Sequence, residues 1–235
     1  MNEWLDQWEA AAERFAACQE QSEFAEVNKA VVKRRFPAFH GERVLDLGCG
    51  YGYYTRYFDS VGARAVGVDG AEAMIRIARE QYPDGNFSVA GLSGPLPFDG
   101  ASFDLVFCNQ VLMDIEDIGP VLRECRRVLK DGGLFYCSIV HPAFFSGSWL
   151  TDGQGYGYAK AVSRYLAPYV CQNHFWGETA HFHRPLSAYL NAATDAGFAL
   201  LRTEEPRSYD GVHKNADLPL FFFAEYEKRH RPAAP

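Results

Sequence analysis

The chain has 235 residues, of which 48% are hydrophobic, which is enough for one large domain with a full buried core. Thirty acidic and 23 basic side chains give a net charge of −7, so we expect no nucleic acid and no anionic membrane surface among its partners. The strongly apolar stretch 218–224 is far shorter than the roughly 20 residues of a membrane helix, and the N-terminus has no basic signal sequence. We therefore expect a cytoplasmic protein.

Apolar residues at helical spacing predict two helices before the first strand, the second of them behind Ser22 as N-cap. Residues 43–47, 65–69, 86–90, 103–109 and 134–140 read as strands, and 53–60, 71–81 and 121–129 as helices. Gly132 and Gly133 are expected to end the last of these helices. Further along, 187–196 reads as a helix, and 198–203 and 218–227 as strands. This alternation predicts an α/β fold with a mostly parallel sheet and helices on both faces.

The first turn from strand to helix is rich in glycine, with Gly48, Gly50 and Gly52 following Asp46. Glycines let the backbone approach a ligand closely, and a helix N-terminus follows them. An acid at the strand tip suits a ligand with a positively charged group better than a diphosphate. The alternative is a tight turn that needs glycine only for its geometry.

The second strand ends at Asp69, which lies 69 − 50 = 19 residues after Gly50. This interval is close to the roughly 20 residues expected for an acid that binds ribose hydroxyls in a doubly wound sheet. We therefore expect Asp69 to bind a ribose. The alternative is that Asp69 caps the next helix.

Four segments together resemble the class I S-adenosylmethionine (SAM)-dependent methyltransferases: VLDLGCGYGYYT, VGVDGAEAMIRIARE, GPLPFDGASFDLVFCNQVLMDIED and VLRECRRVLKDGGLFYCSIVHP. The likeness spans roughly residues 41–140. It implies a Rossmann-like doubly wound, seven-stranded sheet that is mostly parallel, with an antiparallel C-terminal strand. It also implies SAM as the cofactor, bound by Asp46, Gly48, Cys49, Gly50, Asp69, Gly70, Met74, Leu92, Ser93, Asn109 and Gln110.

The chain departs from this family at two points. Family members commonly have an acid that receives the adenine amino group, whereas Gly91, Leu92 and Ser93 stand here, so we expect backbone groups or Ser93 to contact adenine. Asp114 stands where many relatives carry a histidine, and we expect it to orient the acceptor or act as a base. An ordinary helix cap or a solvated acid is the alternative.

Residues 142–183 form a stretch too long for an ordinary connection, and it is rich in glycine and aromatic residues. Together with an N-terminal helical cap, residues 1–40, it is predicted to cover the acceptor site of a single domain spanning 1–235. A small satellite core is the alternative. The substrate-binding residues expected within this stretch are Trp149, Tyr156, His174 and Trp176.

The histidines of this stretch do not predict a metal site. His181 and His183 alternate as in a strand, and none of the six cysteines has a Cys-x-x-Cys partner. We expect no metal and no disulfide. His141 directly follows the fifth strand, where catalytic groups gather, and is a candidate for proton transfer. A structural, hydrogen-bonded histidine is the alternative.

The predicted function is N- or O-methylation of a small-molecule acceptor, by in-line attack of an acceptor lone pair on the methyl group of SAM. The net charge and the aromatic insertion lead us to expect a neutral or cationic, planar acceptor. A base is needed only if the acceptor holds its proton at neutral pH. RNA or protein methylation and a non-catalytic SAM-binding module are the alternatives.

Overall fold

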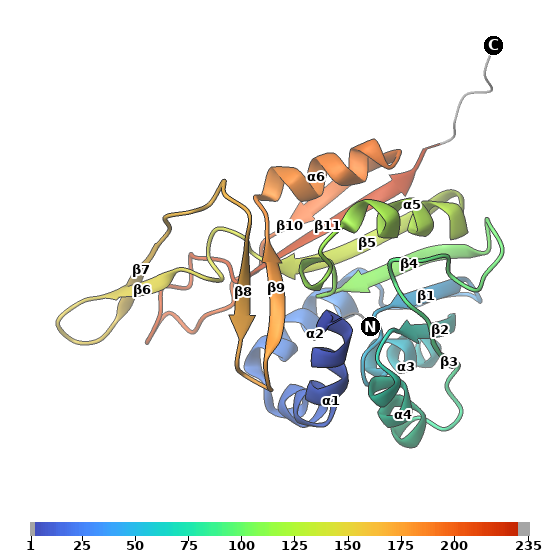
Figure 1. The fold of residues 1–235 in the computed structure, drawn as a ribbon, viewed down its shortest axis with the longest axis horizontal. Helices are drawn as coiled ribbons and strands as arrows, with labels where there is room; N and C mark the ends of the chain where they lie inside the picture. Colours follow the sequence, from blue (N-terminus) through green and yellow to red (C-terminus); the bar gives the residue numbers. More distant parts are fainter. Residues whose placement is uncertain (1–2, 230–235) are drawn as a thin grey trace, which may run out of the picture.

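Seven strands form the central sheet of the computed structural model, which describes residues 3–229 (Figure 1). The strands are β1 (Arg43–Leu47), β2 (Arg64–Asp69), β3 (Phe87–Val89), β4 (Phe103–Asn109), β5 (Leu129–Val140), β10 (Phe198–Glu204) and β11 (Phe221–Lys228). Their order is β10-β11-β5-β4-β1-β2-β3, in which neighbours from β3 to β5 are parallel and β11 is antiparallel to β5 and β10. The predicted sheet is thereby confirmed. The predicted ends of the domain, residues 1–2 and 230–235, lie outside the described residues.

Helices cover both faces of this sheet (Figure 1). The helices are α1 (Glu3–Gln21), α2 (Glu23–Arg35), α3 (Tyr53–Ser60), α4 (Glu72–Gln81), α5 (Ile118–Val128) and α6 (Leu186–Asp195), with a short 3-10 helix η1 (Leu112–Asp114). Ser22 accepts a hydrogen bond from the Ala25 amide and caps α2, as predicted. None of the helices within residues 3–229 is both long and apolar enough to cross a membrane.

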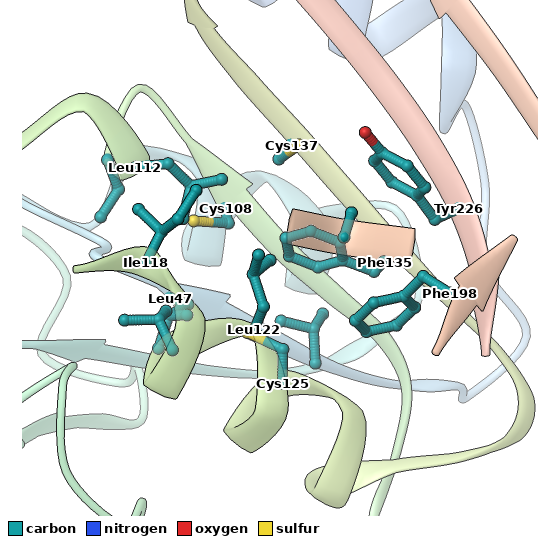
Figure 2. Close-up of a cluster of buried hydrophobic side chains, with 14 of the residues drawn as sticks. Leu47, Cys108, Leu112, Ile118, Leu122, Cys125, Phe135, Cys137, Phe198 and Tyr226 are labelled. Atoms are coloured by element: carbon teal, nitrogen blue, oxygen red, sulfur yellow. The ribbon is translucent and has the colours of Figure 1, made fainter. Parts of the chain in front are cut away.

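Alternate residues of each central strand enter two separate cores. In β4, Val106 and Cys108 pack toward α5 and α6, whereas Leu105 and Phe107 pack toward α2 and α3. Figure 2 shows the first of these cores, in which Leu122 of α5 lies among side chains of the sheet. Because both faces of the sheet are covered, the central strand β4 is buried over most of its length, and the ends of the strands remain open to a ligand.

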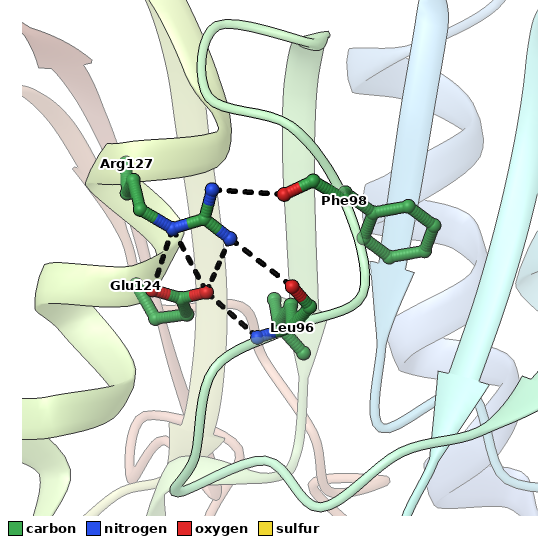
Figure 3. Close-up of polar contacts among 4 residues, drawn as sticks. All are labelled: Leu96, Phe98, Glu124 and Arg127. Carbon is green, nitrogen blue, oxygen red and sulfur yellow. Dashed lines mark hydrogen bonds and ion pairs between the residues drawn. The ribbon is translucent and has the colours of Figure 1, made fainter.

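An ion pair on α5 anchors the connection between β3 and β4 (Figure 3). Arg127 donates hydrogen bonds to the carbonyls of Phe98 and Leu96 at 2.8 and 3.1 Å, and Glu124 accepts from the Leu96 amide at 2.7 Å. Arg127 also pairs with Glu124, whose pKa it lowers through their hydrogen bond. This network anchors the connection between β3 and β4 to α5 at Leu96 and Phe98.

The aromatic stretch forms two β-hairpins, which the sequence did not predict as such. They are β6–β7 (Ser148–Thr151 and Gly157–Ala161) and β8–β9 (Tyr169–Asn173 and Thr179–His183). The second hairpin packs on α1: the Ala180 amide donates to Gln7 at 2.9 Å, and the rings of Trp4 and Phe182 meet edge to face. Residues far apart in the sequence therefore lie together beside the ends of the strands (Figure 1).

The role predicted for Gly132 and Gly133 is wrong. Helix α5 ends at Val128, where the Leu129 amide donates to the Cys125 carbonyl, so the glycine pair lies four residues farther on, inside β5. The chain bulges there, because pairing with β4 passes from Leu129 directly to Leu134. Gly132, with φ of 74°, supplies a conformation that the bulge needs.

Gly67 lets β2 pack closely against its neighbours, and this predicts an effect on stability. A Cβ at this position would lie 2.6 Å from Thr55 Oγ1 and 2.8 Å from Phe87 Cδ1. Gly67→Ala should therefore lower the free energy of unfolding by about 1–3 kcal/mol, measured by urea denaturation. Gly94→Ala, where nothing lies within 4 Å, is the control and should cost nothing. Equal stability of the two variants would contradict this account of the packing.

Candidate functional site

A cavity of about 1170 Å³ lies at the carboxyl ends of the central strands. Its lining includes Gly48 after β1, Asp69 at the end of β2 and Asn109 at the end of β4. Helices α1 and α2, both hairpins, the segment around η1 and the segment before β11 also contribute to its wall. Because typical ligand pockets measure about 300–1,000 Å³, this cavity has room for a cofactor and a second molecule.

The glycine turn after β1 forms one wall of the cavity. Gly48 and Gly50 have φ of 72° and 52°, in the left-handed region that other residues seldom adopt. A Cβ on Gly48 would also lie 2.4 Å from Val111 Cγ2. The glycines are therefore needed for the turn itself, and both line the cavity as well.

Asp69 ties this turn to the next one. Its Oδ2 accepts a hydrogen bond from the Gly50 amide and its Oδ1 accepts one from the Ala71 amide, both at 2.9 Å. Burial raises the pKa of Asp69, while these amide bonds oppose the increase. Each carboxylate oxygen can accept a further bond, so Asp69 holds the two turns together and remains able to bind a ligand in the cavity.

Asp46 lies behind the turn and does not line the cavity. Its side chain is 2% exposed and accepts a hydrogen bond from Thr55 Oγ1 at 2.7 Å. Burial raises its pKa to about 7, although the bond from Thr55 opposes this. The position supports the geometry of the turn, and direct contact with a cofactor stays a prediction.

The other predicted cofactor-binding residues lie around the same cavity. Ser138 Oγ bridges the side chains of two of them: it donates to Asn109 at 2.6 Å and accepts from Gln110 at 2.9 Å. Gln110 has a φ of 59°, a strained conformation that is rare outside glycine and clusters at functional sites. The remaining lining residues of the predicted set are Cys49, Gly70, Met74, Leu92 and Ser93.

Asp114 meets a histidine that sequence reasoning had not selected. Its Oδ1 lies 3.1 Å from His181 Nε2, at an angle that does not complete a hydrogen bond, and both side chains line the cavity. Asn173 lies 2.8 Å from the same nitrogen, and the Phe145 ring stacks on the imidazole with 5.4 Å between ring centres. Burial raises the pKa of Asp114 well above its usual range and lowers that of His181 to about 4. The pair is therefore held in its uncharged form.

Arg184 fixes the segment that carries Asp114. Its guanidinium donates to the carbonyls of Leu112, Ile115 and Glu116 at 3.0, 2.7 and 2.8 Å. The alternation of His181 and His183 correctly predicted a strand, but nothing in the sequence indicated which loop this strand would face. Asn173, His181 and Arg184 are thus the residues around Asp114 that only the structure reveals.

Three other predicted site residues do not line the cavity. His141 is buried, with Nε2 2.9 Å from Glu205 Oε1 and Nδ1 accepting from the Ala143 amide, and burial lowers its pKa. Both ring nitrogens of His141 are thus bonded to groups outside the cavity lining. The position of His141 therefore does not support a catalytic role. Tyr156 and His174 also lie outside the lining, whereas Trp149 and Trp176 belong to it.

Several buried polar atoms of the lining have no partner within the described residues. They are Asn28 Oδ1, Asp114 Oδ1 and Trp176 Nε1. Buried polar atoms are normally hydrogen-bonded, so these positions fit a bound ligand. Among residues 3–229 no group of three or more His, Cys, Asp or Glu side chains is arranged to hold a metal ion, and all six cysteines are free thiols.

Residues 45–137 match the family model described as a methyltransferase domain. The chain is 37% identical over 107 residues to a demethylmenaquinone methyltransferase of Tropheryma whipplei, with 45% of each protein covered. It is 31% identical over 112 residues to a ubiquinone biosynthesis O-methyltransferase of Xanthomonas oryzae pv. oryzae, covering 45% of this chain and 47% of that protein. It therefore spans less than half the length of these relatives.

A solved structure extends the likeness beyond the matched segment. An S-adenosylmethionine-dependent methyltransferase from Mesorhizobium loti superposes with a TM-score of 0.73 at 26% identity. The superposition covers 86% of this chain and 97% of the other. The shared fold thus includes elements on both sides of residues 45–137.

The buried Asp46 predicts a dependence of stability on pH. A folded-state pKa of about 7, against an ordinary 3.8, means that folding favours the protonated acid. The stability that this proton contributes is fully present below about pH 4 and is lost as the pH rises to about 7. Asp46→Asn, which keeps an acceptor for Thr55, should remove this loss.

Urea unfolding of both proteins at pH 4.5 and 7.5 measures the effect. Each pKa unit is worth about 1.4 kcal/mol, so wild type should lose at least about 1.4 kcal/mol more than Asp46→Asn over this range. Parallel stability curves would show that Asp46 has an ordinary pKa in the folded protein.

Proposed function

Because the chain belongs to the class I SAM-dependent methyltransferases, we propose that it transfers the methyl group of SAM to a small-molecule acceptor. The observation that carries the proposal is the single cavity that joins the glycine turn and Asp69 to Asp114 and His181. The two relatives above are named for quinone substrates, which supports a small acceptor. The net charge of −7 argues against RNA.

The chain's own residues fit the cofactor. We assign Asp69 to the ribose hydroxyls, the turn at Gly48 and Gly50 to the methionine end, and Met74 with Ser93 to the adenine. The unpartnered Asn28 Oδ1 and Trp176 Nε1 offer one further acceptor and one further donor. When bound, SAM supplies a methyl group on a positively charged sulfur, which is already activated for displacement.

Asp114 and His181 provide the proton acceptor that an acceptor hydroxyl or N–H requires, because both side chains can hold a proton. Burial disfavours the charged forms of both, so it favours a proton on the Asp114 carboxyl group beside a neutral His181. When Asp114 is ionised, it can take the proton of an acceptor hydroxyl or N–H as the lone pair attacks. Arg184 holds η1 in place and His181 packs against Phe145, so the pair is fixed before the acceptor arrives.

Helix α1 and the β8–β9 hairpin serve as the cover of the acceptor site. The ring of Trp176 packs against those of Trp8 and Phe15, at centroid distances of 6.1 and 5.1 Å, and all three line the cavity. The aromatic contacts between α1 and the hairpin keep water away from the reacting groups. Trp149, from the other hairpin, lines the same cavity.

The cofactor assignment predicts the effect of removing Asp69. Asp69→Ala should weaken binding of S-adenosylhomocysteine, the demethylated cofactor, by tenfold or more, because charge-assisted hydrogen bonds are worth about 1.5–3 kcal/mol. Calorimetry measures the affinity. Asp59→Ala provides the control, since Asp59 lies on α3 outside the cavity lining, where it accepts only from the Ala65 amide. Unchanged affinity in a folded Asp69→Ala protein would rule out the ribose assignment.

The proton-accepting role predicts both a rate and a pH profile. With isotopically labelled SAM and a panel of small phenols and aromatic amines, wild type should form methylated product at a rate that rises with pH as Asp114 loses its proton. Its pKa is raised by burial and further by Asp69, so this rise should lie at higher pH than the titration of an ordinary carboxyl group. Asp114→Asn should lower kcat about 100-fold or more and abolish the pH dependence, without changing S-adenosylhomocysteine affinity.

Two results would count against this proposal. One is absence of product from every acceptor that carries a hydroxyl or N–H. The other is an Asp114→Asn enzyme with wild-type kcat and pH profile. Asp195→Asn, an exposed acid at the end of α6, is the matched control and should behave as wild type.

A further inference from the structure

Two lysines from separate segments meet around one tryptophan at the wall of the cavity. Lys160 Nζ of β7 lies 4.8 Å from the ring centre of Trp149, and Lys214 Nζ lies 5.9 Å from it. Lys214 Nζ is also 5.6 Å from the ring of Tyr209, which meets Trp149 edge to face at 5.0 Å. All four side chains line the cavity.

The backbone holds these residues in place. The Gly157 amide donates to the His213 carbonyl at 3.0 Å, and the Asn215 amide donates to the Gly157 carbonyl at 2.8 Å. These bonds join the β6–β7 hairpin to the segment that precedes β11, which lies beside it in Figure 1. The lysine pair is thus built from two connected parts of the fold.

Neither ammonium group has an acidic partner within residues 3–229. Lys160 donates one hydrogen bond, to the Gly147 carbonyl at 2.6 Å, and burial together with the charge of Lys214 lowers its pKa. The neighbouring acids are already engaged, since Asp210 pairs with His213 and Asp217 with Arg207. The two half-buried positive charges repel each other, as the effect of Lys214 on the pKa of Lys160 shows, and an anion bound beside them would offset that cost.

We propose that Lys160, Lys214, Trp149 and Tyr209 form a subsite for an anionic group, a carboxylate or phosphate, on the apolar body of the methyl acceptor. This inference rests on the proposed function and adds the charge of the acceptor to it. The aromatic rings supply the apolar surface against which such a body packs, and the lysines select its charge. The sequence led us to expect a neutral or cationic acceptor from the net charge of −7, but a net charge does not show where two cations lie together at the wall of a cavity.

Binding of small probes tests the subsite without requiring turnover. With S-adenosylhomocysteine at saturation, ligand-detected NMR titration gives the dissociation constants of benzoate, phenyl phosphate and benzamide. Wild type should bind at least one of the two anions roughly tenfold more tightly than the neutral amide, and which anion binds better distinguishes carboxylate from phosphate. In Lys160→Gln/Lys214→Gln the anions and the amide should bind within twofold of one another.

Two controls make the result specific. Arg207→Gln removes an exposed cation of the same segment that pairs with Asp217, and it should keep the wild-type preference for anions. The double lysine variant should also bind S-adenosylhomocysteine with wild-type affinity.

Equal binding of the amide and the anions by wild type would overturn the subsite, and so would a preference for anions that survives the double substitution. Loss of S-adenosylhomocysteine affinity in the double variant would also overturn it, because the lysines would then bind the carboxylate of the cofactor. Lysine-dependent, sub-micromolar binding of tRNA that displaces benzoate would overturn it as well. Failure of the proposed function is a separate result, because it would appear as absence of methylated product while the preference for anions remained.

Discussion

The carboxylate of Asp69 accepts hydrogen bonds from the amides of both Gly50 and Ala71, so the turns after β1 and β2 share one acceptor. Parallel strands bring these turns to the same edge of the sheet, and a buried carboxylate needs such donors to remain ionised. The bond from Gly50 holds the glycine turn in its left-handed conformation, and this in turn shapes the wall of the cavity. The cofactor end of the site depends on this one contact.

The surroundings of Asp114, the proposed acceptor end, are built differently, from segments that no local rule brings together. Asp114 follows β4, His181 comes from a hairpin almost 70 residues later in the chain, and Arg184 holds the Asp114 segment by three backbone carbonyls. The cavity thus combines residues of the segment that matches the family model, 45–137, with residues of α1, α2, the two hairpins and the segment before β11.

This division explains what the sequence could predict. The alternation of strands and helices predicted the sheet. The spacing of Asp46, Gly48, Gly50 and Asp69 is local to two consecutive strand–turn–helix units, and it brought Gly48, Gly50 and Asp69 to one cavity. Asp46 shows the limit, since spacing locates a residue at a strand tip but does not decide whether its side chain faces the cavity or the core. His141 was likewise expected at the strand edge, but its ring contacts Glu205, which lies 64 residues away in the sequence, and does not face the cavity. The hairpins, the pairing of Asp114 with His181 and the meeting of Lys160 with Lys214 are all long-range contacts, which periodicity does not encode.

A crystal structure with S-adenosylhomocysteine tests the central claim most directly, namely that one cavity holds the cofactor on Asp69 and presents its sulfur to the Asp114–His181 pair. We predict ribose hydroxyls within hydrogen-bonding distance of the Asp69 carboxylate, with the sulfur directed toward the space beside Asp114 and His181. A cofactor whose ribose does not contact Asp69, or whose sulfur points away from that pair, would contradict the account.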